Sequence, residues 1–465
     1  MAFDIRKIIY NFPEVRRPAE KKISFNTKLK WTLIVLVSFF ILANIPLYGV
    51  SAGFLERFEF LEVILGTDFG SIITLGIGPI VMASIILQLL MGSGIIKVNP
   101  KTEEGKRQYQ AMQKIGVLFF VVFEAVVYVS MGGIQAVQGF TGIVIFQLIL
   151  GGLAIVFMDE VVQKWGFESG VSLFIVAGVT WRLFTGLFQF LGPSGENCLV
   201  DFGGTPCAGN VLVIIQSFIN GAPKEALAAF ATIAVTAIIF LIVVWAQSLK
   251  VEIPLSYDRI RGYGFKWPMS FFYASVIPVI LVAALAANIQ LFAGLLENWL
   301  GRATIFGGFS QGQPISGLAY WLGSSNLVEA VIKGSLSSSH LLQALTHFLF
   351  YVVFSALFAV LWVKTSGMDE SSQAKNIISS GLQVPGFRKD PRVLESILAR
   401  YIMPLTIMGG LAIGALASLA DLFGALTSGT AILLAVMIMY KLYQNIAKQH
   451  TFDMHPGLKK MFAQG

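Results

Sequence analysis

Charged residues are scarce in this chain. Only 13% of its 465 residues are Asp, Glu, Lys or Arg, whereas 55% are hydrophobic. Soluble domains usually carry roughly 25% charged residues, so the composition excludes an ordinary soluble protein and predicts a chain that crosses a membrane several times. The first apolar run, residues 29–50, is longer than the core of a signal peptide and lacks a small-residue cleavage site, so we expect it to be retained as a span.

Motifs for catalysis are also missing. Residues 105–106 lack the rest of a phosphate-binding loop, and Gly76–Pro79 lacks the third glycine of a dinucleotide fingerprint. No His-Glu-x-x-His pattern or nucleophile elbow occurs. His340 and His347 share a span but are seven residues apart, and we expect them to lack an acidic partner and to pack or to meet headgroups. The sequence therefore predicts neither an enzyme nor a bound cofactor or metal ion.

Ionisable residues inside the predicted spans are few. Glu124 and Arg182 lie within spans, and Asp159 and Glu160 lie at the edge of one. A carboxylate in a membrane is costly, so Glu124 is either a functional group or a neutral or paired residue that fastens two helices. A proton- or sodium-coupled transporter usually needs more such groups. The scarcity favours a passive channel over a pump.

The chain has only two cysteines, and one connection between spans holds both. Cys198 and Cys207 are separated by a stretch that contains glycine and proline. Because spacing alone does not show geometry, a disulfide and two unpaired thiols remain alternatives. A metal site is not expected here, since no other Cys or His lies nearby in the sequence.

Ten apolar segments are long enough to be spans. They are residues 29–50, 71–92, 114–132, 140–160, 169–191, 227–247, 269–291, 340–363, 398–419 and 425–443. One set of alternating loops, together with both termini, holds 28 Lys and Arg residues, and the other set holds 4. The positive-inside rule then predicts a multi-pass protein of the plasma membrane with both termini in the cytoplasm.

The spans divide into two groups of five. We expect a basic cytoplasmic segment, residues 1–28, followed by a first half, residues 29–191. An exterior connection, residues 192–226, leads to the second half, residues 227–446, and a cytoplasmic tail, residues 447–465, follows the second half. An odd number of spans per half gives the halves opposite orientations. The second span of each half carries a proline, Pro79 and Pro278, and interrupted helices at matching places indicate a functional site between the halves. Chance placement of the prolines is the alternative.

The stretch before the second span is short and amphipathic. Glu56, Glu59 and Glu62 recur every third residue and share one face of a helix, while apolar residues share another. Such a helix is too short and too charged to cross a bilayer. Followed by a span broken at Gly76–Pro79, it predicts an element that lines a path through the membrane.

Two cytoplasmic loops of the second half, residues 248–268 and 364–397, combine arginine with glycine, proline and aromatic residues. This composition is typical of folded protrusions, and arginine in such loops suits phosphate or carboxylate recognition. The alternative is that the charges serve only to set the topology.

Several of these motifs together resemble the SecY-type protein-conducting channels, and the details are closest to the archaeal and eukaryotic branch. The resemblance rests on Ile73–Val81, on Ile277–Ile280 in a span that ends Ala287–Gln290, and on Arg261–Tyr263 and Gly386–Arg388 in the loops. It implies an all-α membrane protein whose ten transmembrane helices form two inverted five-helix halves around a central pore.

The resemblance also implies residues for the pore and its closure. An aliphatic ring would close the pore; its residues are Ile77, Val81, Val171, Ile175, Ile280 and Leu434. A plug, residues 55–67, would close the exterior funnel; its apolar and small residues are Leu55, Phe58, Leu61, Ile64, Leu65 and Gly66. A narrow ring of branched apolar side chains excludes ions by dewetting. Ordinary helix packing is the alternative reading of the ring.

A lateral gate is implied as well, with polar positions at Gln88, Glu124 and Asn288, although Met82 stands where relatives often have a small polar residue. The resemblance implies loop contacts with the ribosome; their residues are Arg259, Arg261, Arg388 and Lys389. The implied partners are a small single-span SecE/gamma-type subunit, a second small beta-type subunit, the ribosome, signal sequences, nascent polypeptides and the lipid membrane.

The function implied is that of the central subunit of a protein translocase. Such a subunit passes unfolded secretory polypeptides across the membrane and releases transmembrane segments sideways into lipid, driven by the ribosome or another partner. The rival hypothesis is an inverted-repeat secondary transporter of a small solute. A midplane site with convergent charges would favour the transporter, and the sequence offers Glu124 alone.

Overall fold

The computed structural model describes residues 14–19, 23–50, 70–92, 95–96, 98, 103–130, 134–167, 169–190, 197–200, 206–257, 264–310, 313–379, 382–383 and 391–454. Within these ranges, nine helices are long and apolar enough to cross a membrane. A further apolar helix, α4 (Gly78–Gly92), occupies most of the second predicted span. The chain is therefore a helical, multi-span membrane protein, as its sequence predicts.

The chain forms two compact units. The first comprises residues 1–180 and 438–465, and the second comprises residues 181–437. Helices of the first unit are α2 (Phe25–Ala43), α4, α5 (Glu103–Ser130), α6 (Thr141–Trp165), most of α7 (Gly170–Phe188) and the end of α16 (Gly429–Met454). Helices that lie wholly in the second unit are α8 (Asn210–Ile219), α9 (Pro223–Ser248), α10 (Ile277–Leu300), α11 (Gly317–Leu322), α12 (Leu327–Lys333), α13 (Ser338–Thr365), α14 (Glu370–Ser379) and α15 (Pro391–Leu422).

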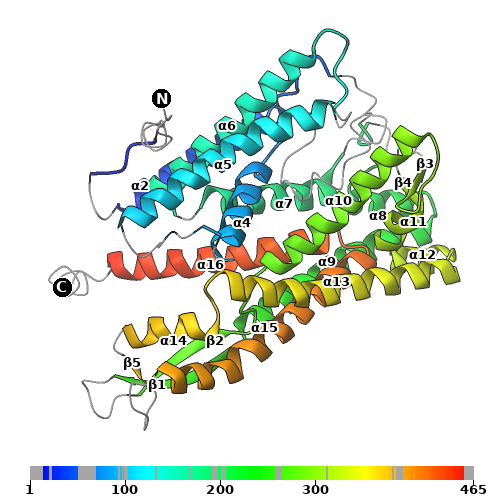
Figure 1. Cartoon of the computed structure of the whole chain (residues 1–465). Coiled ribbons are helices and arrows are strands. Elements are labelled where there is room, and N and C mark those ends of the chain that lie inside the picture. Colours follow the sequence, from blue (N-terminus) through cyan, green and yellow to red (C-terminus); the bar gives the residue numbers. More distant parts are fainter. Residues whose placement is uncertain are drawn as a thin grey trace. The chain divides into compact units, whose positions relative to one another are not determined.

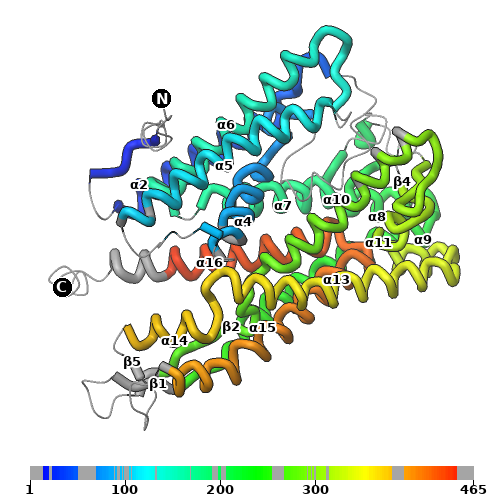
Figure 2. The backbone as a smooth tube through the Cα atoms, in the orientation of Figure 1, coloured from blue at the N-terminus to red at the C-terminus, as the bar shows by residue number. Residues whose placement is uncertain are grey.

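The first unit is built around α6, which lies beside α2 and α5 (Figures 1 and 2). Its core is one cluster of buried aliphatic and aromatic side chains, among them Val121 and Leu148. Phe39 of α2 stacks on Phe174 of α7 with ring centroids 4.7 Å apart. Close packing of this kind is what holds membrane helices together, so this contact fastens α2 to α7.

The second unit is built around the pair of long helices α13 and α15. Small residues on α15 let the two backbones approach. A β-carbon at Gly414 would lie 2.5 Å from the Tyr351 carbonyl oxygen, and one at Gly410 would lie 2.9 Å from Ala356 Cα. Small residues four apart are the usual way in which membrane helices pack closely. The core therefore depends on glycine at these positions.

Two loops of the second unit share one sheet. Strands β1 (Lys250–Tyr257) and β2 (Gly264–Ser270) form an antiparallel hairpin, and β5 (Leu382–Gln383) pairs with the end of β1. The three strands lie together beside α14 at one end of the unit (Figure 1). Beneath them, residues such as Ile253 and Leu398 belong to one apolar cluster. A second hairpin, β3 (Gly308–Ser310) with β4 (Gln313–Ser316), lies in the connection between α10 and α11.

The prolines of the second and seventh spans begin helices and do not break them. Helix α4 starts at Gly78 and α10 starts at Ile277, so Pro79 and Pro278 each stand second in their helix. Proline costs little there because the first backbone N–H groups of a helix have no partner within it. The expectation of spans interrupted in mid-helix is therefore wrong; the residues before each proline form turns.

Candidate functional site

The backbone before α4 is repeated before α10. Gly76 has a φ of 54° and Ser275 a φ of 60°, and each stands three residues before its proline. The amide of Gly76 donates to the carbonyl oxygen of Ile73 at 2.8 Å, and that of Ser275 donates to Phe272 at 3.0 Å. Two segments in different units therefore enter their helices through the same left-handed turn.

Two candidates for the aliphatic ring stand at matching positions after these turns. The amide of Val81 donates to the carbonyl oxygen of Ile77 at 3.1 Å, and the amide of Ile280 donates to Val276 at 3.2 Å. Each bond closes the first turn of its helix. Val81 and Ile280 therefore occupy the same place relative to the proline. The sequence alone did not show that these two positions are structurally equivalent.

A glycine on another helix lies against each of these turns. A β-carbon at Gly151 of α6 would lie 1.8 Å from the Ile72 carbonyl oxygen, and one at Gly409 of α15 would lie 2.8 Å from the Phe271 carbonyl oxygen. Ile72 and Phe271 each precede their proline by seven residues. In each unit, the fourth span of the half thus places a glycine against a backbone carbonyl group at the start of the turn.

The remaining ring candidates lie partly or wholly within apolar cores. Ile77 is 4% exposed, and the partly buried Val81, Val171 and Ile175 pack against the same cluster of the first unit. Leu434 on α16 packs against the core of the second unit. Partial exposure of aliphatic side chains is what a dry constriction requires, since its lining must face a passage as well as the core.

The gate candidates lie on three membrane helices. Gln88 is on α4, Asn288 is on α10, and Glu124 is a half-buried residue in the C-terminal half of α5. Helices α4 and α5 are linked by a hydrogen bond of 2.9 Å from Gln113 Nε2 to Ser84 Oγ. This bond joins two helices that pack together within the first unit, and single bonds of this kind in membranes average about 0.6 kcal/mol.

Two groups of candidates lie outside the described residues. These are the plug, residues 55–67 with Leu55, Phe58, Leu61, Ile64, Leu65 and Gly66, and the loop cations Arg259, Arg261, Arg388 and Lys389. The strands from which the two cationic segments depart are described. Ser256 pairs with Gln383 and Tyr257 with Leu382, so loops more than one hundred residues apart are joined by a β-ladder.

An ion cluster that the sequence did not reveal holds the N-terminal segment. Lys114 Nζ of α5 lies 3.2 Å from a Glu14 carboxylate oxygen and 3.0 Å from Glu160 Oε1, and Lys164 Nζ lies 2.7 Å from the same oxygen of Glu160. Lys164 also donates to the carbonyl oxygen of Val15 at 2.7 Å. Residues far apart in sequence make this cluster, and only the charge types give a signal for it.

The charge state of Glu14 follows from these contacts. Burial raises the pKa of its carboxyl group. Hydrogen bonds from Lys114 and Lys164, together with their positive charges, lower the pKa by more than burial raises it, so the pKa lies below its ordinary value. The carboxylate is thus ionised at neutral pH and pairs with both lysines. The N-terminal segment is fastened to the middle of α5 and the end of α6 by charge and by hydrogen bonds to its backbone carbonyl groups.

A second missed contact involves His347. Its Nδ1 lies 2.8 Å from the Leu322 carbonyl oxygen, which can only accept, so Nδ1 carries the proton of that bond. Its Nε2 lies 3.8 Å from Asp421 Oδ2, and Asp421 Oδ1 accepts from the Gly429 amide at 2.6 Å. The expectation that His347 lacks an acidic partner is wrong, because the acid comes from another helix. His340 caps the first turn of α13 through Ser337.

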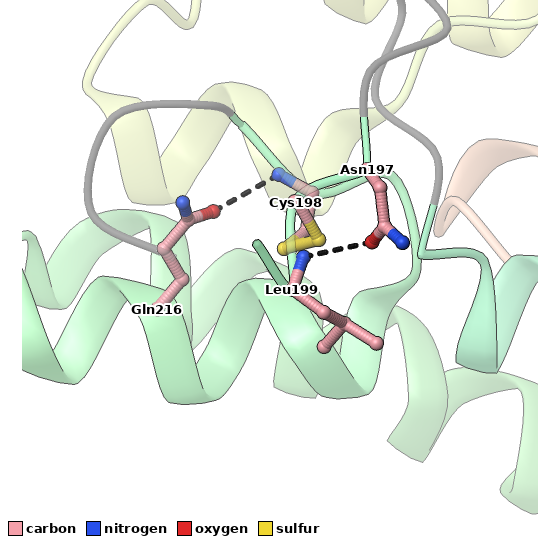
Figure 3. Close-up of a disulfide and its surroundings, with 5 residues drawn as sticks. Asn197, Cys198, Leu199 and Gln216 are labelled. Atoms are coloured by element: carbon pink, nitrogen blue, oxygen red, sulfur yellow. Dashed lines mark hydrogen bonds between the residues drawn. A yellow bond between two sulfur atoms is a disulfide. The ribbon is translucent and has the colours of Figure 1, made fainter. Parts of the chain in front are cut away.

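Cys198 and Cys207 form a disulfide with an S–S distance of 2.07 Å and a Cα–Cα distance of 5.3 Å. Figure 3 shows Gln216 of α8 directed at this loop, where its Oε1 accepts from the Cys207 amide at 3.0 Å. Among the described residues, no group of three or more His, Cys, Asp or Glu side chains is arranged to hold a metal ion.

Comparison with known proteins gives a consistent result. A family model described as SecY matches residues 71–443. The chain is 39% identical to protein translocase subunit SecY of Pyrococcus furiosus, over 98% of this chain and 99% of that one. It is 41% identical to protein translocase subunit SecY of Methanothermobacter thermautotrophicus, over 96% of each chain.

Solved structures agree with this. A structure of a protein-conducting channel matches with a TM-score of 0.77 at 37% identity, covering 98% of this chain and 99% of that one. Sec61 in a canine ribosome-channel complex from the endoplasmic reticulum matches with a TM-score of 0.76 at 35% identity, over the same shares of the two chains. A study of the SecY plug domain, which stabilises the closed state of its channel, describes another match with a TM-score of 0.77 at 37% identity, again over 98% of this chain and 99% of that one.

Proposed function

The chain belongs to the SecY family, and we propose that its two halves enclose the path along which an unfolded polypeptide crosses the membrane. It is a multi-span membrane protein and the channel-forming subunit of a protein translocase. The main observation in support of such a path is the repeated turn before α4 and α10, which places Val81 and Ile280 at equivalent positions. The match supports a path to which the two halves contribute equivalent residues.

The ring assigned to this path is Ile77, Val81, Val171, Ile175, Ile280 and Leu434. All six are aliphatic. A constriction lined by such side chains repels water and ions, yet it makes no hydrogen bond that a passing peptide would have to break. The packing of Val81, Val171 and Ile175 against one apolar cluster supports the assignment, because all three keep part of their surface free of that cluster.

Sideways release into lipid requires a seam that opens. We assign this seam to α4 and α5 on one side and to α10 and α13 on the other, with Gln88, Glu124 and Asn288 as its polar residues. Weak polar contacts suit such a seam, since an inserting apolar helix competes with about 0.6 kcal/mol per hydrogen bond. A signal sequence would open it by binding the open state more tightly than the closed one.

The plug and the cytoplasmic loops are assigned from the family. Residues 55–67 close the path from the exterior, as the plug domain does in the SecY channel compared above. The loops joined by β1 and β5 present Arg259, Arg261, Arg388 and Lys389 to the ribosome, and folding both loops into one sheet supports a shared surface. Ribosomal RNA supplies phosphates for these cations.

The assembly and the orientation complete the proposal. A single-span SecE/gamma-type subunit and a small beta-type subunit accompany the channel in the plasma membrane, and both termini face the cytoplasm. The distribution of 28 Lys and Arg residues on one side against 4 on the other supports this orientation. The chain itself catalyses no reaction, so movement of the polypeptide draws on translation or on another partner.

Ion conductance of the reconstituted channel tests this function. The purified channel with its single-span partner would be measured with and without residues 56–66. We expect the deletion to raise conductance or the frequency of brief openings, because the ring alone closes the path less completely than the ring and the plug together.

The matched control replaces the same eleven residues by a Gly/Ser linker of equal length. It separates loss of the plug from shortening of the connection, and it should conduct like the deletion. If all forms remain silent even with a signal peptide added, the ring and plug assignments are wrong. A screen of small solutes would then test the alternative, an inverted-repeat secondary transporter.

A further inference from the structure

Helix α8 exposes apolar side chains and buries polar ones, which is the opposite of what a helix in water does. Ile215, Phe218 and Ile219 are 47%, 73% and 66% exposed, and their spacing places them on one face. The opposite face holds Gln216 and Ser217, which are only 8% and 4% exposed. A surface helix of a soluble region shows the reverse pattern. The exposed face of α8 therefore suits an apolar surrounding.

The buried polar face has a defined partner. Gln216 accepts a hydrogen bond from the amide of Cys207 at 3.0 Å, so α8 is fixed to the disulfide loop from its protein side (Figure 3). The disulfide with Cys198 closes that loop, and the Cys198 amide donates to the Phe190 carbonyl oxygen at 2.9 Å. In the part of the chain that the structure describes, these contacts are made from the polar side of α8 and leave its apolar face exposed.

Helix α8 is held at the level where two spans end. Gly209 precedes α8, and its amide donates to the Gln189 carbonyl oxygen at 2.9 Å, just beyond the end of α7. Asn210 Nδ2 donates to the Gly186 carbonyl oxygen at 3.2 Å. At the other end only three residues, 220–222, lead into the span α9. The helix thus lies at the boundary of the bilayer that α7 and α9 cross.

The span that precedes α8 and the disulfide loop also expose apolar side chains. Trp181, Phe184 and Phe188 on α7 are 40%, 57% and 46% exposed, and neighbouring rings in this series lie 6.4 Å and 5.3 Å apart. Aromatic residues gather where spans meet the membrane surface. In the disulfide loop, Leu199 and Val200 are 54% and 84% exposed. Exposed apolar side chains therefore occur on α7 and in the disulfide loop as well as on α8.

Charge is scarce in the same stretch. The disulfide loop contains one charged residue, Asp201, directly after Val200, and the sequence then contains no Asp, Glu, Lys or Arg until Lys224. A loop of this length in water would normally carry charges, and a surface for a charged partner would need them. Neutral residues with an apolar outer face fit the zone between headgroups and acyl chains.

We propose that α8 and Cys198–Val200 form an anchor in one leaflet, in which Val200, Phe218 and Ile219 insert among the lipids. The disulfide holds Val200 at the level of α8, and Gln216 fixes the orientation of the helix. This anchor secures the link between the fifth and sixth spans at the membrane surface. The orientation proposed above places the anchor in the outer leaflet. The rest of this proposal does not depend on that orientation.

Site-specific photo-crosslinking tests the anchor. A photoreactive phenylalanine analogue would replace Phe218 or Val200 in the assembled channel, reconstituted in phosphatidylcholine and phosphatidylglycerol vesicles. Phe184 on the span α7 serves as the lipid-facing reference, and Lys266, whose side chain is 72% exposed in β2, serves as the water-facing control. We expect lipid adducts at Phe218 and Val200 close to the yield at Phe184, and several-fold above that at Lys266.

Crosslinks from Phe218 to a protein subunit, or lipid yields no higher than at Lys266, would overturn the anchor. Neither result would bear on ion conductance, so the channel function stands or falls separately. A double variant, Cys198→Ser with Cys207→Ser, tests the role of the disulfide. Its lipid adducts at Val200 should fall several-fold while those at Phe184 stay unchanged; unchanged adducts at Val200 would show that the disulfide does not position the loop.

Discussion

The turns that lead into α4 and α10 follow the same backbone path with different residues. Gly76 takes the left-handed conformation in the first unit, and Ser275 takes it in the second. Glycine adopts this conformation freely, whereas a residue with a side chain pays roughly 1–2 kcal/mol for it. A turn that forms even with serine is determined by its surroundings and not by local preference, which indicates that the position of the following helix depends on it.

The two turns also differ in how closely a neighbouring helix approaches. At Gly151 a β-carbon would lie 1.8 Å from a backbone oxygen of the turn, and at Gly409 it would lie 2.8 Å away. Backbone oxygens cannot move aside as the end of a flexible side chain can. The first turn is therefore the more tightly enclosed, and substitutions around it should have the larger effects.

The largest effect is expected from Gly151→Ala. Its methyl group would overlap the Ile72 carbonyl group, so α6 or the turn must shift. Such a shift exceeds ordinary overpacking, and we expect a loss of more than about 3 kcal/mol in stability. Thermal unfolding of the purified channel in detergent measures this. Gly142→Ala is the control on the same helix, because a β-carbon at Gly142 has no neighbour within 4 Å.

A smaller effect is expected from Gly409→Ala in the second unit. Here the β-carbon would lie 2.8 Å from the Phe271 carbonyl oxygen, so the backbone must still shift, but by less than at Gly151. We expect a loss of about 1–2 kcal/mol, the usual cost of one extra methyl group in a packed core. The same unfolding experiment checks it. Equal losses for Gly409→Ala and Gly151→Ala would contradict the difference between the turns.

The third prediction concerns Gly76→Ala. Its φ of 54° favours glycine, so alanine should cost about 1–2 kcal/mol. Because the turn sets the start of α4, the variant should also change channel conductance when Ile77 shifts. Gly139→Ala is the control: its φ is 90° and its β-carbon would have no neighbour within 4 Å, so it carries conformational cost away from the path. If Gly139→Ala changed conductance as much as Gly76→Ala does, the change would not be due to the turn before α4.

The sequence predicted the spans well because each depends on local composition. All ten predicted segments correspond to apolar helices, although their ends differ. The prolines were misread as breaks, since a proline near the middle of an apolar run and a proline that starts a helix within that run leave the same pattern. Only the turn conformation at Gly76 and Ser275 distinguishes the two, and serine gives no sign of a left-handed turn.

Contacts between distant residues could not be predicted in this way. The pairing of Tyr257 with Leu382 joins two loops whose sequences carry no complementary motif. The contact of His347 with Asp421 joins α13 to α15, and the ion cluster of Glu14 needs two lysines from separate helices. One sequence gives the charges but not which of them meet, because meeting depends on how the helices pack.

The smallest effect is expected from Ser275→Gly. Removing the side chain relieves the conformational cost at a φ of 60°, while the added freedom of glycine in the unfolded chain offsets part of that gain. We expect a net gain of about 0.5–1 kcal/mol, measured as a higher melting temperature. Ser275→Ala is the control, because it keeps a β-carbon in the left-handed turn and so should not gain. If Ser275→Gly instead lowers stability, the serine side chain itself holds the turn, and the two turns would be the same in shape but maintained by different forces.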